Sequence, residues 1–168
     1  MDLQEDLAIL IRQEEELQFE AFDESTAWQL GSLLYNRATA QRWPLLIDVR
    51  LFDRALFLAA TPGITADNHD WVRRKTNTVR RFLCSSYRIA HQLKLEGKNI
   101  TERYQLSPSD YANFGGGFPI TVRGAGVIGS VTVSGLPDRQ DHQLVIDALC
   151  TLLGKPPVPL TLSPHLPA

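Results

Sequence analysis

Apolar residues recur at three- and four-residue intervals in four stretches of the chain, which is the pattern of amphipathic helices. The second stretch begins after Asp23, whose side chain can cap a helix, and ends near Trp43, because Pro44 disfavours helical geometry in the residue before it. Gly97 and Gly154 follow the third and fourth stretches, where a glycine commonly ends a helix. The pattern predicts helices over about residues 3–11, 23–43, 70–95 and 138–153.

Alternating apolar and polar residues, rich in β-branched and aromatic side chains, predict five strands between these helices. LLIDVRLF and ALFLAA, at residues 45–52 and 55–60, indicate a hairpin around a tight polar turn. FPITVR and GVIGSVTVSG, at 118–123 and 126–135, indicate a second hairpin, and a single strand is expected at 17–21. The order of elements favours an α/β (α+β) fold with a central antiparallel sheet flanked by helices.

The C-terminal sequence KPPVPLTLSPHLPA differs in composition from the rest of the chain. It holds five of the ten prolines and shows neither helical nor strand periodicity. We therefore expect one domain over residues 1–155 and an extended, mobile, Pro-rich tail over 156–168, with His165 in that tail.

Charge and cysteine content exclude several classes of protein. The net charge is −2, so nothing draws the whole chain to nucleic acid or to an anionic membrane. No apolar run is long enough to span a bilayer, and the N-terminus is acidic, unlike a signal peptide. Cys84 and Cys150 form no C-x-x-C pair, and no His cluster has metal-ligand spacing. We expect a cytoplasmic protein with two reduced thiols and no metal site.

Glycines between Gly115 and Gly129 invite two opposite interpretations. Residues 124–129 match the string G-x-G-x-x-G, but a strand follows them, so no helix N-terminus is available for a phosphate. Gly115, Gly116 and Gly117 lack the ending of a phosphate loop and precede a strand. Because glycine has no side chain and adopts many backbone conformations, either another backbone or a flat ligand can come close to these residues, and both alternatives stay open.

Three polar residues stand out at predicted helix positions. Lys75 shares an apolar stripe, so its ammonium either pairs with a carboxylate or serves as a functional amine. Asp141 and His142 open the last helix, where the aspartate can cap the helix. The imidazole can carry a proton, meet a metal, pair with a carboxylate, or play a structural part. A single histidine without partner ligands is not a metal site.

Cys84, Ser85 and Ser86 are candidate nucleophiles by residue type only. No G-x-S-x-G elbow surrounds the serines, which fall in the middle of the predicted long helix. The apolar neighbours of Cys84 should raise its pKa and leave the thiol inert.

Four segments together resemble the haem-degrading, GlcG/HbpS-like domain family, in its branch of short proteins. They are WVRRK at 71–75, FLCSS at 82–86, GGGFPI at 115–120, and GVIGSVTVSGLP at 126–137 followed by Asp141-His142. The resemblance covers about residues 5–155. It implies a profilin-like fold, assembly into homo-oligomers, and haem as a possible ligand.

These observations lead to one main hypothesis and one alternative. We expect a homo-oligomeric domain that binds a small anionic or planar ligand, with haem implied by the resemblance, beside strand ends and helix starts. The candidate ligand-binding residues are Lys75, Gly115, Gly116, Gly117, Ser134, Asp141 and His142; no catalytic residue is assigned. The alternative is a non-catalytic interaction or assembly module that binds protein partners through a sheet edge and the C-terminal tail.

Overall fold

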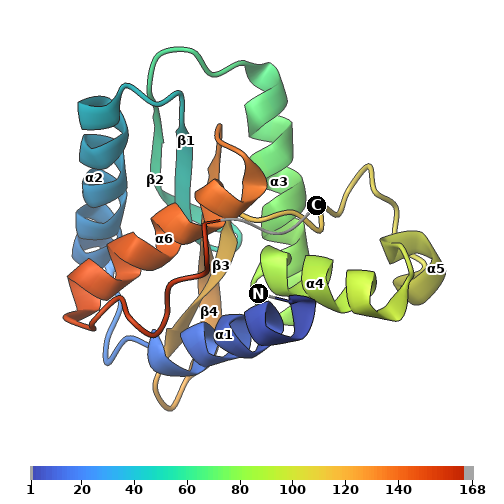
Figure 1. Cartoon of the computed structure of the whole chain (residues 1–168). Helices are drawn as coiled ribbons and strands as arrows, with labels where there is room; N and C mark the ends of the chain where they lie inside the picture. Colours follow the sequence, from blue (N-terminus) through green and yellow to red (C-terminus); the bar gives the residue numbers. More distant parts are fainter. Residues whose placement is uncertain (1, 165–168) are drawn as a thin grey trace.

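The computed structural model describes residues 2–164 as six helices and one four-stranded sheet (Figure 1). The helices are α1 (Leu3–Glu16), α2 (Glu24–Gln41), α3 (Ala66–Phe82), α4 (Ser86–Glu96), α5 (Ile100–Tyr104) and α6 (Asp138–Leu153). The strands are β1 (Leu46–Leu51), β2 (Arg54–Ala60), β3 (Gly117–Val122) and β4 (Gly126–Ser134). None of the described helices is long and apolar enough to cross a membrane.

The sheet has the order β2-β1-β4-β3, and every neighbouring pair is antiparallel. Both hairpins predicted from the sequence are therefore confirmed, and β1 joins them by pairing with β4. Alternate residues of β4 face opposite sides of the sheet. Val131 and Val133 pack in the main core with α2 and α6, whereas Thr132 contacts Thr76 of α3. Helices thus cover both faces of the sheet, which confirms the predicted fold class.

The predicted long helix over 70–95 is two helices. Leu83 adopts a left-handed conformation, with φ of 55°, and its N–H donates to the carbonyl oxygen of Val79 to end α3. The Ser85 side chain then accepts the N–H of Arg88 at 3.1 Å and starts α4. Ser85 and Ser86 consequently lie at a helix start, which corrects their placement in the middle of a helix.

The predicted strand over 17–21 is reduced to a single bridge between Phe19 and Val122. The N–H of Phe19 donates to the carbonyl oxygen of Thr121 at 2.8 Å, and Arg123 donates back to Phe19 at 2.9 Å. Pairing stops there because α2 begins at Glu24, after its Asp23 cap. This segment covers the outer edge of β3.

The C-terminal segment, predicted to be an extended tail, packs against the domain through two of its leucines. Leu160 is fully buried in the main core, and Leu162 packs beside Leu10 of α1. The Gln13 side chain donates to the carbonyl oxygen of Leu160 at 2.6 Å. Two leucines among the prolines supply the apolar area that holds the segment on the domain. His165 lies outside the described residues.

Both cysteines are buried thiols. Burial raises the pKa of Cys84 to about 12, in agreement with the inert thiol expected from its apolar neighbours.

Candidate functional site

An open cleft of about 570 Å³ lies where β4 ends and α6 begins. Its volume falls within the range of about 300–1,000 Å³ that is usual for small-molecule sites. The first half of α3 forms one wall, and Phe114, on the loop before β3, forms another. The lining residues are Asp67, Asn68, Trp71, Lys75, Lys94, Phe114, Ser134, Gly135, Leu136, Pro137, Asp138 and Asp141.

A buried ion pair forms the floor of this cleft. Lys75 Nζ lies 3.1 Å from Oδ2 of Asp141 and donates a second hydrogen bond to the carbonyl oxygen of Val133 at 3.0 Å. Asp141 also accepts the N–H of Leu136 at 3.0 Å. An ammonium carries three N–H donors, so within residues 2–164 one N–H of Lys75 has no acceptor. That donor is available to a ligand.

Burial changes the acidity of both partners in the same sense, toward the neutral form. It raises the pKa of Asp141 to about 6, although Lys75 and two backbone N–H groups oppose the change. Burial also lowers the pKa of Lys75, and the negative charge of Asp141 opposes that change. At pH 7 Asp141 is ionised and provides the charge that stabilises the Lys75 ammonium.

Gly115, Gly116 and Gly117 let the chain before β3 approach the backbone of β4 and α6 closely, beside this ion pair. Gly116 has a φ of 128°, and a Cβ there would lie 2.5 Å from the carbonyl oxygen of Val133 and 2.8 Å from Lys75 Nζ. A Cβ on Gly115 would lie 2.1 Å from the carbonyl oxygen of Asp138. The N–H of Gly117 donates a hydrogen bond to Ser86 Oγ at 3.0 Å. All three glycines are buried and are not lining residues of the cleft; they pack behind the residues that line it.

Two aromatic side chains line the cleft together with Lys75. Trp71 and Phe114 meet edge to face, with ring centroids 5.1 Å apart. The Arg74 guanidinium lies 4.1 Å from the Trp71 ring centroid, and the indole N–H of Trp71 donates to Asp67 at 3.2 Å. Trp71 is therefore held in place, whereas Phe114 is 43% exposed. Neither Trp71 nor Phe114 is among the candidate ligand-binding residues predicted from the sequence.

Ser134 and Asn68 complete the polar part of the cleft. The amide of Asn68 donates to Ser134 Oγ at 3.2 Å, which joins α3 to the last residue of β4. Asn68 was missed because its polar neighbours in the sequence resemble an ordinary exposed helix start. Thus the structure brings Lys75, Ser134 and Asp141 into one cleft, with Gly116 directly behind it.

His142 faces away from this cleft. Its side chain is fully buried, and its Nε2–H donates to Gln13 Oε1 of α1 at 2.7 Å. Burial lowers the pKa of His142 to about 3, so the ring is neutral at physiological pH. Neighbouring helix positions point about 100° apart, which separates Asp141 from His142. The placement of His142 with the other candidate ligand-binding residues is therefore corrected: it joins α6 to α1.

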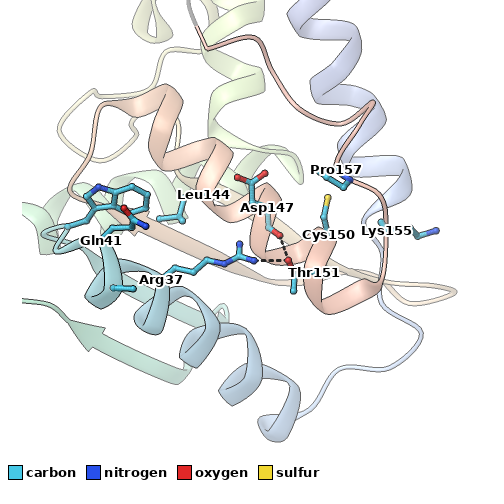
Figure 2. A pocket seen from close by; sticks show the side chains of 10 residues that line it. Arg37, Gln41, Leu144, Asp147, Cys150, Thr151, Lys155 and Pro157 are labelled. Carbon is cyan, nitrogen blue, oxygen red and sulfur yellow. Dashed lines mark hydrogen bonds between the residues drawn. The ribbon is translucent and has the colours of Figure 1, made fainter.

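A second hollow, of about 600 Å³, lies between α2 and α6 (Figure 2). Arg37 donates to Thr151 Oγ1 at 2.7 Å across it, and Thr151 donates to the carbonyl oxygen of Asp147. Trp43 and Cys150 also line it. It contains none of the candidate residues from the sequence, and its Arg37 is already engaged.

The family comparison matches residues 22–150 to the model described as "Haem degrading protein HbpS-like". That range covers most of the chain, from the start of α2 to near the end of α6. The chain belongs to the HbpS-like family. The resemblance found in the four sequence segments is thereby confirmed.

Proteins similar to this chain occur in several bacteria. A UPF0303 protein of Pseudomonas entomophila is 68% identical over 98% of this chain and 91% of its own length. One of Acidobacterium capsulatum is 53% identical over 92% of this chain and 93% of its own length. This chain therefore spans nearly the full length of both relatives.

Solved structures share the fold. The Ybr137w protein has a TM-score of 0.82 and 26% identity, covering 88% of this chain and 87% of its own. HbpS has a TM-score of 0.62 and 19% identity, covering 82% and 93%. A PduOC:heme complex has a TM-score of 0.63 and 17% identity, covering 77% and 94%. At these two lower identities the likeness shows the fold alone.

Haem is the cofactor that the HbpS-like family suggests, and the donor set of the cleft tests that suggestion. Iron in haem proteins is usually held by His, Cys, Met or Tyr. None of these is among the cleft-lining residues in the described part of the chain, and the Lys75 amine is engaged by Asp141. No cluster within residues 2–164 has three or more metal-binding side chains. The cleft therefore does not fit haem held through its iron.

Proposed function

We propose that this HbpS-like chain binds a small planar heteroaromatic molecule in the cleft between α3 and the start of α6. The ring lies against Trp71 and Phe114, and a carbonyl or similar acceptor receives the third N–H of Lys75. The observation that carries the proposal is this buried ammonium, which lines the cleft and has one N–H without an acceptor in the described part of the chain. A preformed donor in the lining of a cleft fixes the orientation of a ligand and gives specificity.

Charge around the cleft narrows the chemical class of the ligand. Two lysines and three aspartates line it, so their formal charges sum to −1. A dianion would be repelled, which argues against the anionic ligand expected from the sequence. Asp138 and Asp67 instead offer acceptors to ring N–H groups. The site suits an uncharged ring system with both a carbonyl acceptor and N–H donors, as in flavin- and pterin-type rings.

The test is a thermal-shift and affinity screen of flavin- and pterin-type ring compounds against the intact protein. Removing the exposed ring by Phe114→Ala should weaken binding of a hit about tenfold, since an aromatic contact contributes on the order of 1 kcal/mol beyond its buried area. Leu83→Ala is the matched control, because Leu83 is 57% exposed and does not line the cleft. Equal affinity of the Phe114→Ala variant and the wild type would overturn the proposal.

Haem is the second candidate, supported by the family and by the fold shared with a PduOC:heme complex. The cleft residues predict that hemin binds no more tightly than its metal-free porphyrin, because no lining side chain suits iron. Absorbance titrations with both compounds measure the ratio. Hemin binding that is at least a hundredfold tighter would show iron ligation and contradict the cleft as the haem site.

The alternative hypothesis of an interaction module loses its tail-based argument. Leu160 and Leu162 are buried against the domain, so this part of residues 156–168 is not a free docking segment. The sheet edge named in the same hypothesis remains.

A further inference from the structure

The two edges of the sheet differ in how they are protected. At β3, the backbone of Phe19 exchanges hydrogen bonds with Thr121 and Arg123, and Pro119 has no N–H to offer. At β2, no strand of the described chain pairs with the outer edge. Unpaired strand edges attract other strands, and soluble proteins normally blunt them with charge, proline or a cover.

The backbone of β2 has donors and acceptors aimed outward. The N–H of Thr61 donates to the carbonyl oxygen of Leu45 on the β1 side at 2.9 Å. Because these groups alternate along an antiparallel strand, Ala59 also faces β1, whereas Leu58 and Ala60 face the free edge. Residues 55–60, ALFLAA, contain neither a charge nor a proline. None of the usual protections is present there.

An apolar surface continues from this edge onto α2. Trp28 is 66% exposed and lines a hollow of about 860 Å³ between β2 and α2, which Leu58 borders at the strand edge. Leu58 is 56% exposed, and its side chain lies on the α3 face of the sheet, as does that of its pairing partner Asp48. The Phe57 ring packs so closely on Gly31 that a Cβ added there would lie only 2.3 Å from it. The same ring meets Trp28 edge to face, with ring centroids 5.5 Å apart. Large exposed apolar side chains beside an open strand edge indicate a protein interface.

We propose that a second copy of this chain covers this edge, its β2 pairing antiparallel with β2 across a twofold axis at Leu58. Two sheets then become one continuous sheet, and Trp28 and Leu58 become buried between the copies. A twofold interface sets a surface against itself, so it tolerates no like charges opposite each other. The uncharged segment meets that condition.

The only charge on the strand also fits this arrangement. Arg54 pairs with Glu24 at 2.8 Å, and an axis at Leu58 sets it opposite Pro62 rather than opposite a second arginine. Pairing with an unrelated strand would not require that like charges avoid facing each other. The proposal also gives the homo-oligomer expected from the family resemblance a defined interface. The interface involves no residue of the ligand cleft, so either proposal can fail without the other.

The first test is the mass of the full chain in solution, by light scattering or sedimentation, with circular dichroism to verify folding. The wild type should have the mass of an even number of chains, at least twice 18.8 kDa. Leu58→Lys, which adds an edge charge, and Leu58→Pro, which removes an outward N–H, should each lower that mass at least twofold. Leu95→Lys is the matched control, because Leu95 is 40% exposed on α4, and it should keep the wild-type mass.

The second test uses cysteine cross-linking, which does not depend on a disruptive variant. Leu58→Cys should form an oxidant-induced dimer, because the axis sets the two side chains opposite each other, while the native cysteines are buried. Leu95→Cys should not. A wild type with the mass of one chain overturns the proposal, as does a folded Leu58→Lys or Leu58→Pro variant with wild-type mass, or the absence of a Leu58→Cys dimer.

Discussion

Lys75 and Asp141 are 66 positions apart in the chain, yet Lys75 Nζ lies 3.1 Å from Asp141 Oδ2, and both side chains are almost completely buried. The pair fixes the middle of α3 to the first turn of α6 at the end of β4. A buried ion pair seldom stabilises a fold more than apolar side chains of similar size would. The spare N–H of Lys75 at the floor of a cleft provides a functional reason for it.

Removing one member of the pair should cost more stability than removing both. Lys75→Met leaves Asp141 buried without its partner and should lower the free energy of unfolding by about 3–5 kcal/mol at pH 7. The double variant Lys75→Met with Asp141→Leu should recover most of that loss. Denaturant unfolding measures both, and equal losses in the two variants would show that the charges are not coupled.

Gly116→Ala should destabilise the protein through a close contact beside the ion pair. Its Cβ would meet the Val133 carbonyl oxygen at 2.5 Å, so the cost should exceed the roughly 1 kcal/mol of the backbone strain alone. Gly124 also has a positive φ, of 79°, but nothing lies within 4 Å of its added Cβ. Gly124→Ala is therefore the control for strain without a clash, and comparable unfolding free energies would argue against the close approach.

Asp141 should titrate near pH 6 in the folded protein, because burial raises its pKa to about 6. In the unfolded chain the value is about 3.9. A raised pKa in the folded state means that this carboxyl group favours folding most below pH 4 and loses that contribution as the pH rises through 6. Carbon-detected NMR of the side-chain carboxyl measures the midpoint, and Asp141→Asn identifies the signal. A midpoint below pH 4.5 would be incompatible with this degree of burial.

Leu160→Ala should lower the free energy of unfolding by about 2–5 kcal/mol, the usual cost of truncating a buried leucine. Val158→Ala, two residues away, should change it by less than about 0.5 kcal/mol, because Val158 is 75% exposed. Chemical denaturation of both variants gives the comparison. If Leu160→Ala is as mild as Val158→Ala, the segment does not pack as described.

The periodic parts of the sequence predicted most of the fold, because each of those elements has a local signal. α2 has Asp23 as its cap, and both hairpins have strands with β-branched or aromatic residues around polar or glycine turns. The break between α3 and α4 has no such signal, since Leu83 takes up a left-handed conformation that usually belongs to glycine. The packing of Leu160 depends on tertiary contacts that a proline-rich composition conceals.

The candidate site was only partly predictable for a similar reason. Lys75 was recognisable as a cation on an apolar stripe, and Asp141 as a polar residue at a helix start. Their contact depends on how α3 and α6 meet at the sheet. His142 was grouped with Asp141 because the two are adjacent in sequence, but the helix turns the imidazole toward Gln13. Phe114 had no periodic pattern around it.

The three tryptophans provide the most direct measurement of where a ligand binds. Trp71 lines the proposed cleft, Trp43 lines the hollow between α2 and α6, and Trp28 lines the hollow beside β2. The experiment is to titrate the protein with a flavin- or pterin-type ring compound and follow the three indole N–H signals by NMR. The account predicts a saturable shift of the Trp71 signal, with a midpoint about tenfold higher in Phe114→Ala, and no change in the other two signals. A saturable shift of Trp43 or Trp28 instead, or no shift with any of these compounds, would contradict it.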